Sequence, residues 1–389
     1  MNVLSLFDGM SCGQQALERA EIKVENYFAS EIDKYAIQVT MANYPNTIQL
    51  GSVVNVDGTK LPQIDLLIGG SPCQSFSFAG KRKGMATTDE QEILTLEHYL
   101  KLKAEGYEFE GQSYLFWEFM RLLYEVKPKY FLLENVEMGE KWERVLTQAI
   151  GVHALHINSA LVSAQNRKRI YFTNIGMEAK GLFGDLESII EKPKDKKILL
   201  KDILESKVDE KYFLSEKILF GFERHKERHN ERGTGFGFNP NDGNKKAVCL
   251  RANAALCPTD NSVIVHSNMN EVEIKLKKSN VQIQKTINKN IFLEGEIKAL
   301  DFYNQSKHDK CPTLADPSHG HIGLIAPTKS TNAVEIVNSR IRRLTPIECM
   351  RLQTVNDNYK MPVSDSQRYK MLGNGWTIEV ISHIFKYII

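Results

Sequence analysis

Apolar and polar positions follow two alternating periods over the first 175 residues of the chain. Short apolar runs bounded by turn residues predict strands at residues 3–7, 24–30, 66–68, 130–134 and 169–175. Apolar residues at helical spacing predict helices at residues 14–20, 34–43, 114–126 and 141–150. This alternation predicts a doubly wound, mostly parallel α/β sheet. Residues 85–111 are charged and helix-prone, and we interpret them as an insertion that caps a loop.

The pattern changes after residue 176. Charges of both signs are dense over residues 192–232, a glycine-rich run follows at 233–237, and β-like pieces at 263–266 and 272–276 have no helical partners. Residues 339–389 return to an α/β pattern, with helices predicted at 346–352 and 377–388. We therefore predict a first domain at 1–176, a smaller irregular β-rich domain at 177–338, and a C-terminal segment at 339–389 that rejoins the first domain.

Composition and charge add few constraints. The 389 residues carry a formal net charge of +2, so only local basic clusters at 81–83, 167–169 and 340–343 could contact nucleic acid, and for each cluster alone a solvated face is the favoured interpretation. The six cysteines form no Cys-x-x-Cys pair, which argues against a disulfide framework and a metal cluster. The sequence has no signal-peptide pattern and no apolar run long enough to span a membrane, so we expect an intracellular protein.

A glycine-bearing turn follows the first predicted strand. The sequence Phe7-Asp8-Gly9-Met10-Ser11-Cys12-Gly13 leads from that strand into a helix, where backbone can approach a ligand closely. Glu31 follows the second strand, at the position where an acidic side chain binds ribose hydroxyls. The turn lacks a Gly-x-Gly-x-x-Gly pattern, so a nucleoside ligand is favoured over a dinucleotide, and glycines that serve only packing are the alternative.

A second turn presents a thiol. The third strand ends in Gly69-Gly70-Ser71-Pro72-Cys73-Gln74-Ser75-Phe76-Ser77, a stiff turn at the edge of the sheet where ligands bind. A thiolate is the strongest side-chain nucleophile near neutral pH. A lone cysteine is more often a buried apolar residue, but small and polar neighbours argue against burial of Cys73.

Five blocks in this order resemble the cytosine-C5 DNA methyltransferases. Gly-Ser-Pro-Cys-Gln-x-Phe-Ser is similar to the family's catalytic loop, and residues 133–136, 165–169, 343–348 and 373–376 resemble its Glu-Asn-Val, Gln-x-Arg-x-Arg, post-variable and final cofactor-contacting blocks. The blocks cover both α/β portions, about 230 residues. The resemblance implies a Rossmann-like methyltransferase sheet, S-adenosyl-L-methionine as the cofactor with S-adenosyl-L-homocysteine as product, and a specific sequence in duplex DNA as substrate.

The chemistry of cytosine explains the implied catalytic residues. C5 is a poor nucleophile until a thiolate adds at C6, and Cys73 would supply that thiolate. Glu134 fits protonation of N3 if its buried site keeps it at least partly protonated. The resemblance implies that Arg169 contacts the cytosine O2 and that Arg167 lies nearby, toward the phosphates. The target base must leave the helix stack to reach these groups.

The resemblance also implies which residues contact the cofactor and the DNA. The implied cofactor contacts are Phe7, Asp8, Gly9, Met10, Cys12, Glu31, Ile32, Ser52, Val53, Gly70, Pro72, Asn374, Gly375 and Trp376. Ser52 departs from the family, which usually has an aspartate at this position that accepts a hydrogen bond from the adenine amino group. Phe-Asp-Gly at 7–9 and Trp376 are closer to the eukaryotic de novo DNA methyltransferases and some phage enzymes. Candidate DNA contacts are Ser77, Lys81, Arg82, Gln165, Arg228, Arg232 and Arg251, with Arg224 and Asn253 also plausible.

Residues 177–338 occupy the place of the family's target-recognition domain. Their length argues for sequence readout on duplex DNA, against RNA cytosine methylation as the alternative, and an intact set of catalytic residues argues against a silent DNA-binding regulator. His225 and His229 are four residues apart, but a solvated helix face is favoured over a shared metal. We expect a monomer in the bacterial cytoplasm or a phage-infected cell, with a separately encoded restriction endonuclease as a candidate partner.

Overall fold

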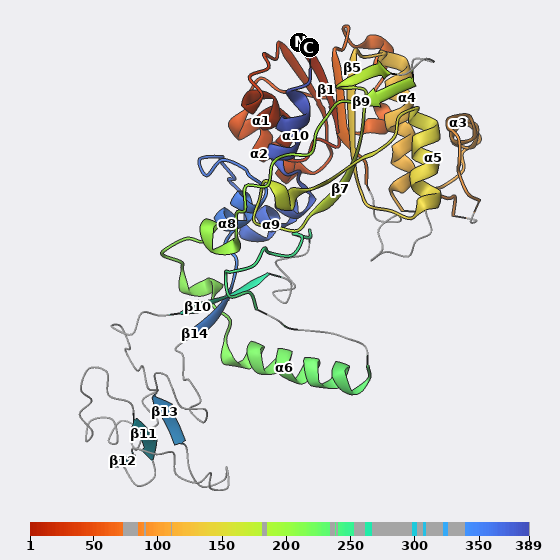
Figure 1. Cartoon of the computed structure of the whole chain (residues 1–389). Coiled ribbons are helices and arrows are strands. Elements are labelled where there is room, and N and C mark those ends of the chain that lie inside the picture. Colours follow the sequence, from red (N-terminus) through yellow and green to blue (C-terminus); the bar gives the residue numbers. More distant parts are fainter. Residues whose placement is uncertain are drawn as a thin grey trace.

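The computed structural model describes residues 1–72, 85–88, 91–109, 111–180, 185–233, 238, 240–252, 261–266, 298–301, 306–308, 322–325 and 339–388. Its central feature is a seven-stranded sheet in the order β3-β2-β1-β4-β5-β7-β6 (Figure 1). The strands are β1 (Asn2–Leu6), β2 (Asn26–Ser30), β3 (Ile48–Gln49), β4 (Leu66–Gly70), β5 (Tyr130–Val136), β6 (Leu155–Asn158) and β7 (Lys168–Thr173). β1 to β5 pair in parallel, and β7 runs antiparallel to both β5 and β6.

Helices cover both faces of this sheet. One face packs against α1 (Cys12–Arg19), α2 (Lys34–Asn43) and α10 (Ile378–Phe385), and the other against α4 (Phe116–Val126) and α5 (Glu140–Ile150) (Figure 1). Successive residues of β4 alternate between the two cores, with Leu66 and Ile68 on the α1 side and Leu67 on the α4 side. Because both faces are buried, the strands are almost continuously apolar. The predicted doubly wound, mostly parallel fold is confirmed.

Three elements of this body were not predicted. β3 and β6 are short or polar, and α9 (Asp365–Asn374) has a weak apolar pattern. The strand predicted at 169–175 is β7, and its antiparallel direction brings its first residues to the carboxyl edge of the parallel strands. The direction of β7 therefore decides which side chains meet at that edge.

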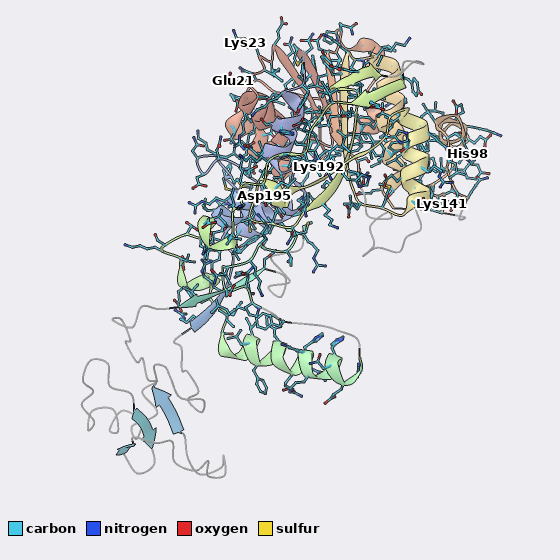
Figure 2. The ribbon with its side chains drawn as sticks, viewed as in Figure 1. Glu21, Lys23, His98, Lys141, Lys192 and Asp195 are labelled. Atoms are coloured by element: carbon cyan, nitrogen blue, oxygen red, sulfur yellow. The ribbon has the colours of Figure 1, made fainter. Side chains whose placement is uncertain are left out.

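The predicted insertion belongs to the core on the α4 side. Its helix α3 (Leu96–Ala104) buries Tyr99 and Leu102 there. Glu118 of α4 is fully buried and accepts hydrogen bonds from Tyr99 Oη and Lys103 Nζ, each at 2.5 Å, and from Arg121 Nε at 2.8 Å. The interpretation as a loop cap is therefore incomplete, because the segment is fixed to the core of the central sheet. The labelled His98 of α3 and Lys141 of α5 lie on the same side of the molecule (Figure 2).

The described part of the predicted second domain contains one long helix and six short strands. They are β8 (Met177–Lys180), β9 (Asp185–Ser188), α6 (Glu216–Glu231), β10 (Ser262–His266), β11 (Lys298–Asp301), β12 (Ser306–His308) and β13 (Ile322–Ile325). β10 pairs with β14 (Ser339–Arg343), and β11 pairs with both β12 and β13. α6 extends away from the central sheet and its helices (Figure 1). The strand predicted at 272–276 lies outside the described residues.

The C-terminal segment returns to the central sheet and its helices through β14 and α8 (Pro346–Leu352). Arg342 of β14 pairs with Glu348 of α8 through two 2.7 Å bonds, and both side chains are almost completely buried. Thr345 and Glu348 form a reciprocal capping box at the start of α8. α9 and α10 then bring residues 373–376 against the first turn of the chain, and the two termini lie close together (Figure 1).

Candidate active site

A cavity of about 870 Å³ opens at the carboxyl ends of β1, β2, β4 and β5. The order of the sheet reverses between β1 and β4, and ligands bind at such a switch point in open α/β sheets. All fourteen candidate cofactor residues line this cavity, together with Glu134, Arg167 and Arg169. The sequence blocks are far apart in the chain, so the fold alone brings them together.

The turn after β1 contains a buried carboxyl group. Asp8 accepts a hydrogen bond from Tyr27 Oη at 2.7 Å and a short one from Ser11 Oγ. Burial raises the pKa of Asp8 to about 6, although these hydrogen bonds act in the opposite direction. Phe7 and Ser11 both adopt left-handed backbone conformations, at φ 57° and 55°, which few non-glycine residues do. Such strained backbone often occurs at functional sites.

Glu31 is fixed at the end of β2. One carboxylate oxygen accepts a hydrogen bond from the amide of Gly9 at 2.8 Å. The other accepts hydrogen bonds from the amides of Ile32 and Asp33, also at 2.8 Å. A carboxylate has about four acceptor positions, so roughly one stays open for a ligand hydroxyl. Beside it, the Ile32 side chain is 72% exposed, which leaves an apolar surface at the cavity.

Glu134 and Arg169 form an ion pair at the opposite side of the cavity. Arg169 Nε lies 2.8 Å from Glu134 Oε1, and the two side chains are 13% and 11% exposed. The pairing of β5 with β7 explains this contact, because Arg169 is opposite Val136 and therefore diagonal to Glu134 on one face of the sheet. The site thus holds a carboxyl group and a guanidinium group in a fixed relation.

β4 runs directly beside this pair. Gly70 is the register partner of Glu134, and a Cβ atom at Gly70 would lie 2.8 Å from Trp376 Nε1 and 3.1 Å from Glu134 Oε2. Only glycine allows the strand to pass so close to both side chains. Asn135 Nδ2 donates to Ser71 Oγ at 3.0 Å, which ties the turn after β4 to the end of β5.

The candidate nucleophile Cys73 lies outside the described residues, as do Ser77, Lys81 and Arg82. The described residues before it, Ser71 and Pro72, line the cavity. Two other cysteines are poor nucleophiles where they stand, because burial raises the pKa of Cys12 to about 12 and that of Cys349 further. Cys249 is half-buried, with its Sγ 3.9 Å from Arg169 Nη2.

Two sequence-based expectations are wrong. Arg167 does not point toward the phosphates, because it is 2% exposed and donates to the carbonyls of Leu250, Gly373 and Gly375. Gln165 cannot contact DNA, because it is fully buried and bonds Leu352 O at 2.7 Å. Arginine and glutamine side chains can reach DNA or satisfy buried carbonyls equally well, and residue type does not distinguish the two roles.

The other candidate DNA contacts in the described structure are exposed. Arg228 and Arg232 lie at the C-terminal end of α6, and Arg251 lies near the end of the described segment 240–252. The rings of His225 and His229 stack with centroids 4.3 Å apart on α6. The described ranges contain no group of three or more His, Cys, Asp or Glu side chains placed to hold a metal ion. Candidate Asn253 lies outside them.

Several lining residues had not been predicted. They are Ser30, Asp33, Ala36, Val54, Ser71, Gly111, Gln112, Tyr114, Leu115, Asn135, Val136, Lys370, Met371 and Gly373. Lys370 precedes the predicted contact Asn374 by four residues on α9, and it pairs with Asp33 at 2.7 Å. Helical spacing would have pointed to Lys370, but only if α9 had been predicted.

Within the described residues, no helix is both long and apolar enough to span a membrane.

Comparison with known proteins adds independent information. The sequence model described as C-5 cytosine-specific DNA methylase matches residues 1–389. The chain is 28% identical to the orphan methyltransferase M.SPRI of Bacillus phage SPR, over 100% of this chain and 97% of that protein. It is 26% identical to the type II methyltransferase M1.ScrFI of Lactococcus lactis subsp. cremoris, over 98% of this chain and 76% of that protein. Its fold is similar to that of the S. pombe Dnmt2 methyltransferase, with a TM-score of 0.57, 15% identity, and coverage of 99% and 97% of the two chains.

Proposed function

The chain belongs to the C-5 cytosine-specific DNA methylases and is a DNA (cytosine-5-)-methyltransferase, and we propose which of its residues carry the reaction. The main support for this proposal is a single cavity that has the Asp8 turn and Glu31 on one side and the Glu134–Arg169 pair on the other. The first side would bind the methyl donor, and the second would bind the cytosine. The end of β4, from which Cys73 follows, lies between them.

S-adenosyl-L-methionine fits the first side. The cavity has the volume of a small-molecule site, and its lining offers an open acceptor position on Glu31, apolar surface at Ile32, and the carboxyl group of Asp8 for a cationic ligand. Ser52, at the start of the short turn Val53–Asn55, would face the adenine with a hydroxyl that makes no cap hydrogen bond. When bound, the cofactor supplies an electrophilic methyl group that the activated C5 takes up, leaving S-adenosyl-L-homocysteine.

Cys73 and the ion pair would activate the cytosine. The thiolate of Cys73 would form a bond to C6, the electron pair of the C5–C6 double bond would shift to form a C4–C5 double bond, and the C4–N3 pair would shift onto N3, which makes C5 nucleophilic. Glu134 supplies a proton or hydrogen bond at N3, and Arg169 stabilises the negative charge that develops at O2. Loss of the C5 proton to water and elimination of Cys73 then restore the ring.

DNA would be held by two regions. The loop that carries Ser77, Lys81 and Arg82 would close over the flipped base, and Arg228, Arg232 and Arg251 would contact phosphates or base edges. Arg224, Arg228 and Arg232 follow one another at intervals of four residues, so they form a basic ridge along α6. We infer that residues 177–338 form the recognition domain and that the protein acts as a monomer; a restriction endonuclease encoded separately is a candidate partner.

The test combines a methyl-transfer assay with position mapping. The protein is incubated with labelled S-adenosyl-L-methionine and either unmethylated genomic DNA or total RNA, and the product is located by nucleoside mass spectrometry and sequencing. We expect 5-methylcytosine in DNA at one short sequence. Cys73→Ser should abolish the label, whereas Cys249→Ser should retain it. Cys249 is the matched control because its Sγ lies 3.9 Å from Arg169 Nη2.

Each result has a distinct meaning. Loss of label in Cys249→Ser with activity in Cys73→Ser would move the nucleophile to Cys249. Label found only in RNA would overturn the DNA substrate. No label in either substrate, with measurable DNA binding, would favour a silent DNA-binding regulator over an enzyme.

A further inference from the structure

A piece of the proposed recognition domain packs against the catalytic body and buries part of its length there. Residues 247–252, here called the crossing segment, pair with the residues that precede Arg167. The amide of Ala247 donates to Ala164 O at 2.7 Å, and the amide of Asn166 donates to Ala247 O at 2.9 Å. Ala247 and Leu250 are buried. Motion of the recognition domain on DNA therefore acts on backbone that is part of the catalytic core.

Arg167 joins the crossing segment to the residues that line the cofactor side of the cavity. Its Nη1 donates to Leu250 O at 3.0 Å and contacts Cys249 Sγ at 3.4 Å. Its Nη2 donates to Gly373 O at 3.2 Å and to Gly375 O at 2.8 Å. A guanidinium group is planar and rigid, so these bonds fix the two segments relative to each other.

Further contacts hold the crossing segment against residues 373–376 and against Gln165. A Cβ atom at Gly373 would lie only 2.3 Å from Arg251 C and 2.4 Å from Ala252 N, so the two backbones are in direct contact. Gln165 Oε1 accepts the Leu250 amide at 3.3 Å. Because these polar groups are buried, breaking their hydrogen bonds would leave donors and carbonyls unsatisfied. The two segments therefore move together or not at all.

Resting on the proposed function, we propose that Arg167 is a positioning residue that couples DNA target recognition to the cofactor segment, residues 373–376. When the recognition domain docks on its target, the crossing segment shifts or stiffens, and Arg167 transmits this change to Gly373 and Gly375. Target binding then strengthens cofactor binding, and cofactor binding strengthens target binding by the same factor. Arg167 needs no contact with either ligand for this role.

The test is a binding cycle with the unreactive product S-adenosyl-L-homocysteine. Its Kd is measured by calorimetry without DNA, with a duplex carrying the mapped target sequence, and with that sequence scrambled. Wild type should bind the product at least ~5-fold more tightly with target duplex, within the usual range of coupling. Arg167→Lys, which can satisfy fewer of the four acceptors, should reduce this factor below ~2-fold. Arg19→Lys is the matched control, because Arg19 also bonds a distant carbonyl, Thr354 O, but does not touch the crossing segment.

Hydrogen exchange gives a second measurement that does not depend on folding of the variant. In wild type without cofactor, target duplex should slow exchange in the peptide that contains residues 371–377. The same factor in Arg167→Lys as in wild type, or an unchanged 371–377 peptide in wild type, would overturn the inference. If wild type binds neither ligand and methylates nothing, the proposed function has failed instead, and the inference fails with it.

Discussion

The buried carboxyl group of Asp8 makes cofactor affinity depend on pH. Burial holds the pKa of Asp8 at about 6 in the ligand-free protein, compared with 3.8 for an ordinary aspartate. The methyl donor carries positive charge, which favours the ionised carboxylate and lowers the pKa of Asp8 in the complex. Below pH 6 the free protein must therefore release a proton before it can bind, and affinity should fall.

The magnitude follows from the pKa of the free protein. With a pKa of about 6, Asp8 is mostly protonated at pH 5 and mostly ionised at pH 7. Binding should thus be roughly tenfold weaker at pH 5 than at pH 7, or ~1.4 kcal/mol, and nearly constant above pH 7. The effect of Asp8 on folding stability has the opposite dependence on pH. Because burial raises the pKa of Asp8, this group stabilises the folded state fully below pH 3.8, and the contribution is lost as the pH rises through 6.

Calorimetry in buffers of different ionisation enthalpy measures both the affinity and the protons released. At pH 6 we expect about half a proton released per S-adenosyl-L-methionine bound. Asp8→Asn should remove the release and flatten the profile between pH 5 and 7. The described lining residues include no histidine, so no other side chain among them ordinarily titrates in this window. Equal wild-type affinity at pH 5 and pH 7, or an unchanged slope in Asp8→Asn, would refute the reasoning.

Three further substitutions test the site and its support. Ser52→Asp should tighten cofactor binding by ~1 kcal/mol, since a charged acceptor forms a stronger hydrogen bond, whereas Ser52→Asn should not; calorimetry that shows no gain rejects the idea. Gly70→Ala should lower kcat at least ~10-fold by displacing Trp376 and Glu134 at a cost of ~1–3 kcal/mol, and single-turnover rates within twofold of wild type would contradict it. Glu348→Gln should reduce the free energy of unfolding by ~3–5 kcal/mol because buried Arg342 loses its charged partner, and a loss below ~1 kcal/mol in urea titration would disprove this.

Local patterns in the sequence were enough for the elements that position the site. α2 and α8 begin and end where they were predicted, and each has a clear start signal in the capping side chain of Asp33 or Thr345. The turns after β1 and β4 were recognised because their small and polar residues interrupt apolar strands. Short β3 and polar β6 carry too little apolar signal to be separated from loops.

What the sequence determined by itself is therefore the order of strands and helices, the family blocks, and the set of residues that gather at one edge of the sheet. Only the tertiary structure decided that β7 runs antiparallel, which brings Arg169 to Glu134. It also decided that Gln165 and Arg167 are buried against backbone carbonyls. The physical reason is that strand direction and side-chain burial depend on contacts between residues distant in the chain, and such contacts leave no local period in the sequence.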